Sequence, residues 1–330
     1  MPASRKAVPY WPPTRREFIQ TLAGVGLSAV APARAQAPGA GAETITYKSV
    51  DGLDIHADVW GGGAGRKKPV VVWIHGGALI MGSRSGVPRA LCNQWLALGY
   101  VVVSIDYRLA PETRLPEIVA DLRDAFEWVR KHGPKRFGMD PDRIAAAGGS
   151  AGGYLTLMAG FHVKPRPRVL ASFWGYGDIT TPWYAEPDAF YRKQLLVSRE
   201  EALASVGTMP LAEPPPQSRR GQFYLYCRQQ GLWPVEVSGH DPRREPKWFD
   251  SYCPIRNVSR EYPPTILIHG TEDTDVPYSE SRNMAARLKE AGVEHELITV
   301  EGGGHGLGGS APQVVEDANA RAVAFIRARL

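Results

Sequence analysis

A serine set among glycines and a histidine set among glycines are the residues of this sequence best suited to covalent chemistry. Ser150 lies in GGSAG at 148–152, which fits G-x-S-x-G, and His305 lies in GGGHG at 302–306. A serine hydroxyl becomes a nucleophile when a nearby imidazole accepts its proton. The pair therefore predicts attack on a carbonyl carbon, with Ser150 as nucleophile and His305 as base.

The base needs a carboxylate to orient it, and three aspartates compete for this role. Asp273 and Asp275 both lie in HGTEDTDVP at 269–277, directly after a short apolar run, and Asp178 follows an earlier run. Asp273 or Asp275 completes the chain order Ser, Asp, His that goes with a nucleophile on a G-x-S-x-G turn.

A loop of glycines offers the groups that would stabilise negative charge during such an attack. The run HGGA occupies 75–78. Glycines let backbone N–H groups approach a developing oxyanion, and a second donor follows the nucleophile. We expect the N–H groups of Gly77, Ala78 and Ala151 to form this oxyanion hole. His75 and His269 are interpreted as residues that orient their loops.

Alternating strands and helices would position these residues. A turn dipeptide, Asp51-Gly52, predicts a hairpin of 43–48 and 53–60. Later apolar runs are typical of buried parallel strands, and longer segments have helical spacing. We therefore predict an α/β fold with a mostly parallel sheet covered by helices on both faces. The expected strands are 69–74, 100–105, 143–147, 169–174, 264–268 and 296–300, and the helices 89–98, 115–131, 151–161, 279–291 and 314–328.

The predicted serine turn lies between a strand and a helix. A serine on a sharp strand-to-helix turn has a strained backbone, and only small neighbours leave room for it. The helix N-terminus beside it favours negative charge. This context supports a catalytic interpretation of the motif over a glycine turn that only packs a strand on a helix.

Residues 175–262 interrupt the alternation. They are rich in Pro, Trp, Tyr and Arg, and so long a loop without structure is unusual in a compact domain. We interpret them as a cap inserted into a catalytic domain of 43–174 and 263–330, with helices near 199–206 and 219–230. Six cap aromatics would stack on a sugar or aryl group or form the core of the cap: Trp183, Tyr184, Phe190, Tyr224, Tyr226 and Trp233.

The N-terminus has the pattern of an export signal. A paired-arginine segment, TRREFI at 14–19, precedes an apolar stretch, and Ala33-Arg34-Ala35 offers a cleavage site. Residues 1–35 hold five cations and one anion, so they carry +4 of the net charge of +5. We expect a twin-arginine signal over 1–35, a linker over 36–42, and a periplasmic or secreted protein that has no membrane span after cleavage and does not bind nucleic acid.

The three cysteines, Cys92, Cys227 and Cys253, form no C-x-x-C pair. The pattern therefore predicts no structural metal, and the chemistry above needs no cofactor. Cys227 and Cys253 are either bridged or separate buried thiols.

The segment 69–161 resembles the hormone-sensitive-lipase-like carboxylesterases. It carries HGGA at 75–78, DYRLAPE at 106–112 and GGSAGG at 148–153, although that family usually has Asp at the position of Gly149. The segment 265–306 instead resembles prolyl-oligopeptidase-type peptidases, whose HGxxDxxVP motif implies Asp273 as the acid. The same mixture occurs in acetyl-xylan and feruloyl esterase-like hydrolases.

These resemblances imply an α/β-hydrolase fold and a serine hydrolase that cleaves small-molecule or carbohydrate esters through an acyl-enzyme. Two alternatives remain open: a serine peptidase acting on short peptides, and a non-catalytic binding module on the same fold.

Overall fold

The computed structural model describes residues 41–330 apart from 64 and 66. The predicted signal and most of the predicted linker lie outside the described residues. The chain begins there with an antiparallel hairpin of β1 (Glu43–Val50) and β2 (Leu53–Trp60). Asp51 and Gly52 both have positive φ, 51° and 80°, as a tight two-residue hairpin turn requires. The predicted hairpin is confirmed.

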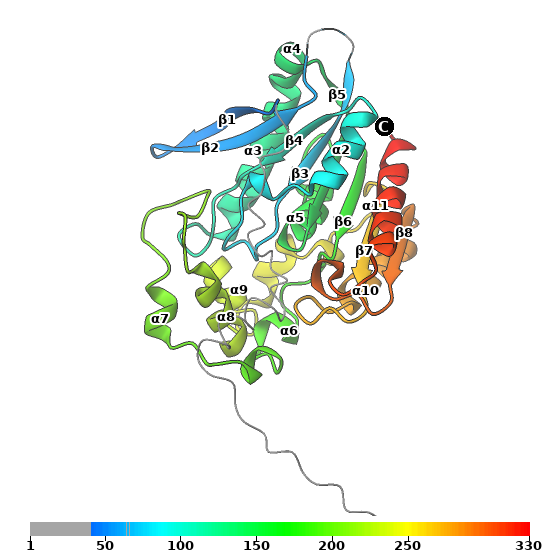
Figure 1. The fold of residues 1–330 in the computed structure, drawn as a ribbon. Helices are drawn as coiled ribbons and strands as arrows, with labels where there is room; N and C mark the ends of the chain where they lie inside the picture. Colours follow the sequence, from blue (N-terminus) through cyan, green and yellow to red (C-terminus); the bar gives the residue numbers. More distant parts are fainter. Residues whose placement is uncertain (1–40, 64, 66) are drawn as a thin grey trace, which may run out of the picture. The chain divides into compact units, whose positions relative to one another are not determined.

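The hairpin opens an eight-stranded sheet in the order β1-β2-β4-β3-β5-β6-β7-β8 (Figure 1). β2 pairs antiparallel with β4, and all pairs from β4 to β8 are parallel. The predicted mostly parallel sheet with an antiparallel start is confirmed. Its remaining strands are β3 (Lys68–Ile74), β4 (Val101–Ile105), β5 (Met139–Gly149), β6 (Val169–Phe173), β7 (Thr265–Gly270) and β8 (His295–Val300).

Helices cover both faces of the sheet, and the side chains of β3 show why. Val70, Val72 and Ile74 belong to one buried cluster, whereas Val71 and Trp73 belong to another. Alternate residues of a strand point to opposite faces, so each face has its own core. The first core takes in α3 (Leu115–Lys131), α5 (Ala151–His162) and α10 (Ser279–Glu290), and the second takes in α2 (Arg89–Ala97) and α11 (Pro312–Arg327).

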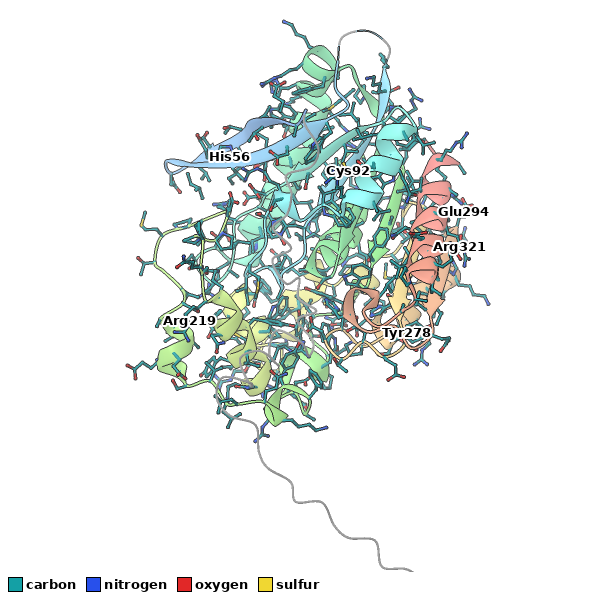
Figure 2. The ribbon with its side chains drawn as sticks, in the orientation of Figure 1. His56, Cys92, Arg219, Tyr278, Glu294 and Arg321 are labelled. Carbon is teal, nitrogen blue, oxygen red and sulfur yellow. The ribbon has the colours of Figure 1, made fainter. Side chains whose placement is uncertain are left out.

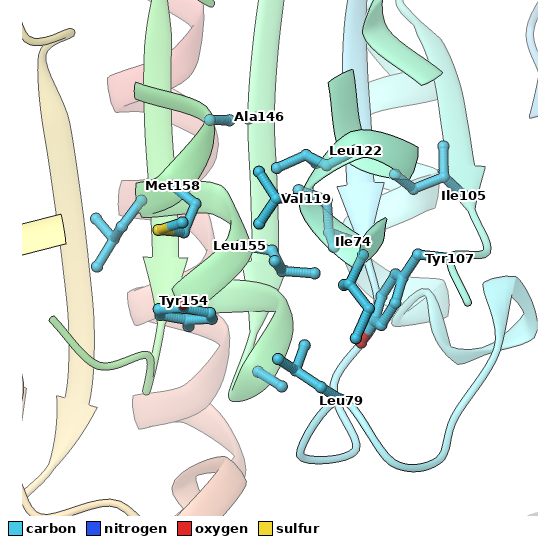
Figure 3. Packing of buried hydrophobic residues seen from close by; sticks show 14 of the residues in the cluster. Ile74, Leu79, Ile105, Tyr107, Val119, Leu122, Ala146, Tyr154, Leu155 and Met158 are labelled. Atoms are coloured by element: carbon cyan, nitrogen blue, oxygen red, sulfur yellow. The ribbon is translucent and has the colours of Figure 1, made fainter. Parts of the chain in front are cut away.

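The helices form where the sequence has apolar residues at helical spacing. On α3, Ile118, Leu122 and Phe126 are fully buried, and Figure 3 shows Val119 and Leu122 of this helix beside Leu155 of α5. Sequence periodicity did not reveal α4 (Gly133–Phe137), which is too short to repeat a hydrophobic pattern.

Residues 175–262 connect β6 to β7, and we call them the inserted segment. Its helices α6–α9 lie together beyond the lower end of the sheet in Figure 1. Two helices were predicted, near 199–206 and 219–230. Two more, each with a proline in its first turn, were not. The helices are α6 (Pro182–Ala185), α7 (Arg199–Leu203), α8 (Arg220–Gln230) and α9 (Trp233–Ser238).

Side-chain hydrogen bonds attach the inserted segment to the loops that follow β3 and β4. The Nε1–H of Trp233 donates to the carbonyl of Ala78 at 2.9 Å. Arg220, only 3% exposed, pairs with Glu112 at 2.7 Å and donates to the carbonyl of Ile80 at 2.5 Å. The segment is therefore fixed to the loop that follows β3.

Three of the six aromatics singled out in this segment are buried: Tyr184, Tyr224 and Trp233. The ring of Tyr184 stacks between Trp183 and Trp233, with centroid distances of 3.7 and 4.0 Å. The sequence left two roles for these aromatics, stacking on a substrate or forming the core of the segment. The buried, stacked rings form the core of the segment. The three cysteines, all within the described part of the chain, are buried and free, so the structure contains separate thiols and no bridge.

Candidate active site

Ser150 lies on a sharp turn between β5 and α5. Its φ and ψ are 57° and −122°, a region that costs a non-glycine residue strain energy. Its N–H donates to the carbonyl of Phe173 on β6 at 2.9 Å, and α5 begins at Ala151. The strained turn is thus held from a neighbouring strand, with the hydroxyl beside a helix N-terminus.

The glycines around Ser150 are required by space. A Cβ on Gly152 would stand 2.0 Å from the carbonyl oxygen of Ile74, and one on Gly148 would stand 2.4 Å from the carbonyl oxygen of Gly152. At Gly149, where the resembling family usually has Asp, a Cβ would lie 3.2 Å from the ring of Trp174. Trp174 therefore occupies the space that a longer side chain at 149 would need.

His305 reaches Ser150 from the loop after β8. Its Nε2 lies 3.1 Å from the Ser150 Oγ. The loop packs closely because a Cβ on Gly270 would stand only 2.1 Å from the carbonyl oxygen of Gly303, and Gly306 has a positive φ of 69°. These glycines let the loop fold back onto the end of β7 and carry the imidazole to the serine.

Asp273 occupies the other nitrogen of the imidazole. Its Oδ2 lies 2.8 Å from the Nδ1 of His305. Its Oδ1 accepts the backbone N–H groups of Asp275 and Val276, each at 2.9 Å. Burial acts to raise the pKa of Asp273, but the hydrogen bonds from His269 and His305 outweigh it and hold that pKa well below its usual range. The carboxylate is therefore charged at neutral pH.

His269 supports the aspartate from behind. Its Nε2 lies 3.1 Å from the Asp273 Oδ2 and 2.9 Å from the carbonyl of Val276, while its Nδ1 lies 2.7 Å from the hydroxyl of Ser281. An Nε2–H shared by the first two acceptors fits these contacts. The predicted bracing role of His269 agrees with its position.

The other two candidate acids lie elsewhere. Asp275 is on the opposite side of the imidazole, with its Oδ2 3.5 Å from the Nε2 of His305. Asp178 contacts Arg256 at 3.1 Å and the hydroxyl of Thr180 at 2.6 Å. The structure thus brings together Ser150, His305 and Asp273, and it leaves Asp275 as a second carboxylate beside the reacting nitrogen.

Two carboxylates raise the pKa of His305 above its ordinary value. Burial lowers this pKa, but the charge of Asp275 and the hydrogen bond and charge of Asp273 together outweigh burial. Sequence reasoning missed the contact of Asp275 with His305, and it missed Arg228, which pairs with Asp275 at 2.7 Å. Only the helical spacing of Tyr224 and Arg228, which places them on one face of α8, is a signal in the sequence.

The loop that carries HGGA lies directly against the nucleophile. A Cβ on Gly76 would stand 3.3 Å from the Cβ of Ser150. Gly77 and Ala78 have positive φ, 108° and 56°, and a Cβ on Gly77 would stand 2.1 Å from the carbonyl oxygen of Met81. Among the described residues, no acceptor pairs with the N–H of Gly77 or Ala78, and the N–H of Ala151 precedes the bonded turns of α5. These donors are free to meet an oxyanion.

His75 is buried beneath this loop. Its ring stacks on Tyr107 with a centroid distance of 4.2 Å, and its Nδ1 lies 2.7 Å from the carbonyl of Gly76. Burial lowers the pKa of His75 to about 4, so the ring is neutral at pH 7.

Another histidine, His56, lies on β2 of the hairpin, as Figure 2 shows.

Within residues 41–330, excluding 64 and 66, no group of three or more His, Cys, Asp or Glu side chains is placed to hold a metal ion. No helix in the same residues is long and apolar enough to cross a membrane.

Comparisons with known proteins give this site its family context. The non-reducing polyketide synthase trt4 of Aspergillus terreus is 30% identical to this chain. The match covers 83% of this chain but only 13% of the synthase. Esterase LipC of Mycobacterium tuberculosis is 29% identical over 72% of this chain and 53% of its own. This chain therefore spans only a small part of trt4 and about half of LipC.

A solved structure shares the fold. The esterase of Pyrobaculum calidifontis superposes with a TM-score of 0.65 at 23% identity, covering 96% of this chain and 93% of that one. A family model described as alpha/beta hydrolase fold matches residues 71–308. The predicted family is confirmed: this chain belongs to the alpha/beta hydrolase fold family.

Proposed function

We propose that the chain is a serine hydrolase that cleaves carboxylic esters through an acyl-enzyme. The observation that carries the proposal is the continuous path from the Ser150 Oγ to the Nε2 of His305 at 3.1 Å, and from its Nδ1 to Asp273 at 2.8 Å. A nucleophile, a base and a group that orients the base are the parts that this chemistry requires. The esterase named among the relatives supports the choice of ester as substrate.

The proposed reaction has two halves. His305 accepts the Ser150 proton as the hydroxyl attacks the ester carbonyl, and the imidazolium then gives that proton to the departing alcohol. Water attacks the acyl-enzyme with the same base and releases the acid. Asp273 fixes the imidazole with its Nδ1 proton toward the carboxylate. The N–H groups of Gly77, Ala78 and Ala151 bind the oxyanion in both halves, where a single donor is worth about 10²- to 10³-fold in rate.

The substrate would reach Ser150 beside the inserted segment. We keep small esters and carbohydrate esters as the proposed substrate class, on the resemblance to acetyl-xylan and feruloyl esterases. Phe190 and Tyr226, which lie outside the stack on Tyr184, are partly exposed and remain able to stack on a sugar or aryl group. A panel of esters that varies acyl length and alcohol, including acetylated xylo-oligosaccharide, tests this class.

Export through a twin-arginine signal is part of the proposal and rests on the sequence of residues 1–35. Expression of the full chain in a bacterial host should deliver a periplasmic protein whose first residue is Gln36. Replacing both Arg15 and Arg16 by Lys should leave the precursor in the cytoplasm. Equal amounts of the wild-type protein and of the double-lysine variant in the periplasm would contradict the export proposal. The catalytic proposal would not be affected.

Hydrolysis assays separate the three functions. We expect p-nitrophenyl acetate to be cleaved, proline p-nitroanilide to be cleaved far more slowly, and Ser150→Ala to be inactive on both. Faster cleavage of the anilide would favour the peptidase. Folded wild-type protein that cleaves neither, and that a fluorophosphonate does not label, would favour the binding module.

A further inference from the structure

A second carboxylate lies against the nitrogen of His305 that faces the nucleophile. The Oδ2 of Asp275 is 3.5 Å from the Nε2 of His305, while the Ser150 Oγ is 3.1 Å from the same atom. Asp273 already occupies Nδ1. The triad chemistry described above gives Asp275 no task, so its place beside the reacting nitrogen needs its own explanation.

The inserted segment fixes the orientation of this carboxylate. The Oδ1 of Asp275 accepts the hydroxyl of Tyr191 at 2.8 Å, the hydroxyl of Tyr224, and the Nη1 of Arg228 at 2.7 Å. Across the described part of the chain, Oδ2 has one partner, the imidazole of His305. The three donors hold Oδ1 of Asp275, and Oδ2 is therefore directed toward the imidazole of His305.

The charges around the imidazole favour its protonated form. The carboxylates of Asp273 and Asp275 face it, and His269 stands behind Asp273. The opposing cation, Arg228, is 1% exposed and pairs with Asp188 at 2.8 Å as well as with Asp275. Asp188 and Asp275 together outnumber this one guanidinium, so the cluster next to the base keeps a negative charge.

We propose that Asp275 is a positioning residue that, held by the inserted segment, stabilises the imidazolium form of His305. The proposal rests on the role of His305 as base under the proposed function. It has two consequences of opposite sign. The imidazolium that forms during attack is stabilised, which speeds acylation. The free enzyme also holds a proton on Nε2 at a higher pH, where that nitrogen cannot accept the proton of Ser150.

The geometry predicts how the pH profile responds to a neutral residue. A carboxylate in contact with an imidazole raises its pKa by roughly one unit or more. Burial lowers the pKa of His305, but the charges of Asp275 and Asp273 outweigh burial, so the net shift is upward. The acid limb of kcat/KM reports the base in the free enzyme. In Asp275→Asn we therefore expect this limb to move to lower pH by about one unit, with a lower plateau.

The first experiment measures kcat/KM for p-nitrophenyl acetate from about pH 5 to pH 9 in wild type, Asp275→Asn and Asp178→Asn. Asp178 is an aspartate of the inserted segment that pairs with Arg256, so its variant is the matched control and should keep the wild-type midpoint. Asp275→Glu keeps the charge and should restore at least part of the raised midpoint. An acid limb that stays in place in a folded Asp275→Asn protein would overturn the proposal.

A second experiment needs no turnover. The imidazole of His305 is titrated by NMR in the Ser150→Ala background, with and without Asp275→Asn. A lower midpoint with Asn supports the proposal, and an unchanged or higher midpoint overturns it. If the midpoint falls but the wild-type protein hydrolyses no ester, the proposed function fails while the charge relation between Asp275 and His305 stands.

Discussion

Apolar burial holds both the central sheet and the inserted segment, but the segment adds buried ion pairs to it. The central strands β3, β4, β6 and β7 are almost entirely apolar and buried, with a separate hydrophobic cluster on each face of the sheet. The inserted segment also packs into the first of these clusters, through residues such as Phe223 and Trp233. In addition it reaches the site through two buried arginines, Arg220 and Arg228, which pair with carboxylates and carbonyls of the catalytic body. Apolar burial is non-directional and tolerant, whereas each buried ion pair depends on both partners. We therefore expect changes in the sheet and its loops to abolish catalysis, and changes in the inserted segment to alter its rate.

The largest effect should come from the acid attached to the sheet. We expect Asp273→Asn to lower kcat by about 10⁴-fold, because the amide no longer holds the imidazole in the required tautomer. Asp178→Asn, in the segment, should keep most of the activity. Parallel assays on p-nitrophenyl acetate, with melting temperatures to confirm folding, check both. Full activity in Asp273→Asn together with complete loss in Asp275→Asn would show that the acid is misassigned.

A large effect on stability, confined to the segment, should follow from Arg220→Met. Glu112, whose side chain is fully buried, would lose its cationic partner and keep the N–H of Gly207, and breaking a buried pair costs about 3–5 kcal/mol. We expect faster proteolysis within 199–219 before the sheet unfolds. Arg219→Met is the control, since that arginine is exposed at the start of α8 (Figure 2). The double variant Arg220→Met, Glu112→Met should recover part of the loss, and equal proteolysis of all forms would contradict the comparison.

A smaller effect should follow when the segment releases the oxyanion loop. Trp233→Phe keeps a ring to stack on Tyr184 but removes the N–H that donates to the carbonyl of Ala78 at 2.9 Å. A hydrogen bond of this kind contributes about 0.5–1.5 kcal/mol, so we expect kcat to fall about 2- to 10-fold with little change in KM. Trp248→Phe, which alters a ring stacked on His240 and Tyr252, should leave kcat unchanged. An equal loss in both variants would mean that only the packing matters.

The smallest effect concerns a carboxyl group where α10 meets the segment. Glu280 accepts the N–H groups of Gly177 and Asp178, each at 3.1 Å. Burial raises its pKa to about 7 despite these bonds. Because the folded state holds the proton more tightly than the unfolded state, Glu280 costs stability as the pH rises from about 4.5 to 7. A glutamine keeps an acceptor without the charge.

Glu280→Gln should therefore melt close to wild type at pH 5 and a few degrees above it at pH 8. Glu290→Gln, on the same helix and exposed, should show no such divergence. A gap in melting temperature between Glu280→Gln and wild type that is constant from pH 5 to pH 8 would contradict the assigned shift.

The same two regions differ in how far the sequence predicts them. Apolar runs such as 69–74 and 100–105 identified the buried strands, and periodicity gave α3 its observed bounds, Leu115–Lys131. Local patterns could not give the strand order, because β4 lies between β2 and β3 through a crossover. They also placed β5 at 143–147, whereas the strand is Met139–Gly149 and runs directly into the serine turn.

In the inserted segment, local patterns located α8 to within a residue but not the contacts that matter. Arg228 meets Asp275, 47 residues away, and Arg220 meets Ile80, 140 residues away. Contacts between such distant residues depend on the tertiary fold and leave no periodic signal. The motif around Asp273 drew attention to two carboxylates, and the resemblance to the peptidases favoured Asp273. The structure has Asp273 on Nδ1 and Asp275 beside Nε2, a contact that the motif did not predict.

In the proposed reaction the Ser150 hydroxyl attacks the ester and carries the acyl group. Acid quench of the protein within the first turnover of p-nitrophenyl acetate, followed by peptide mass mapping, tests it directly. We predict one acetyl group per molecule on Ser150, and none in Ser150→Ala or His305→Ala. An acetyl group on another residue, or full hydrolysis with Ser150 replaced by alanine, would contradict the role of Ser150 as nucleophile.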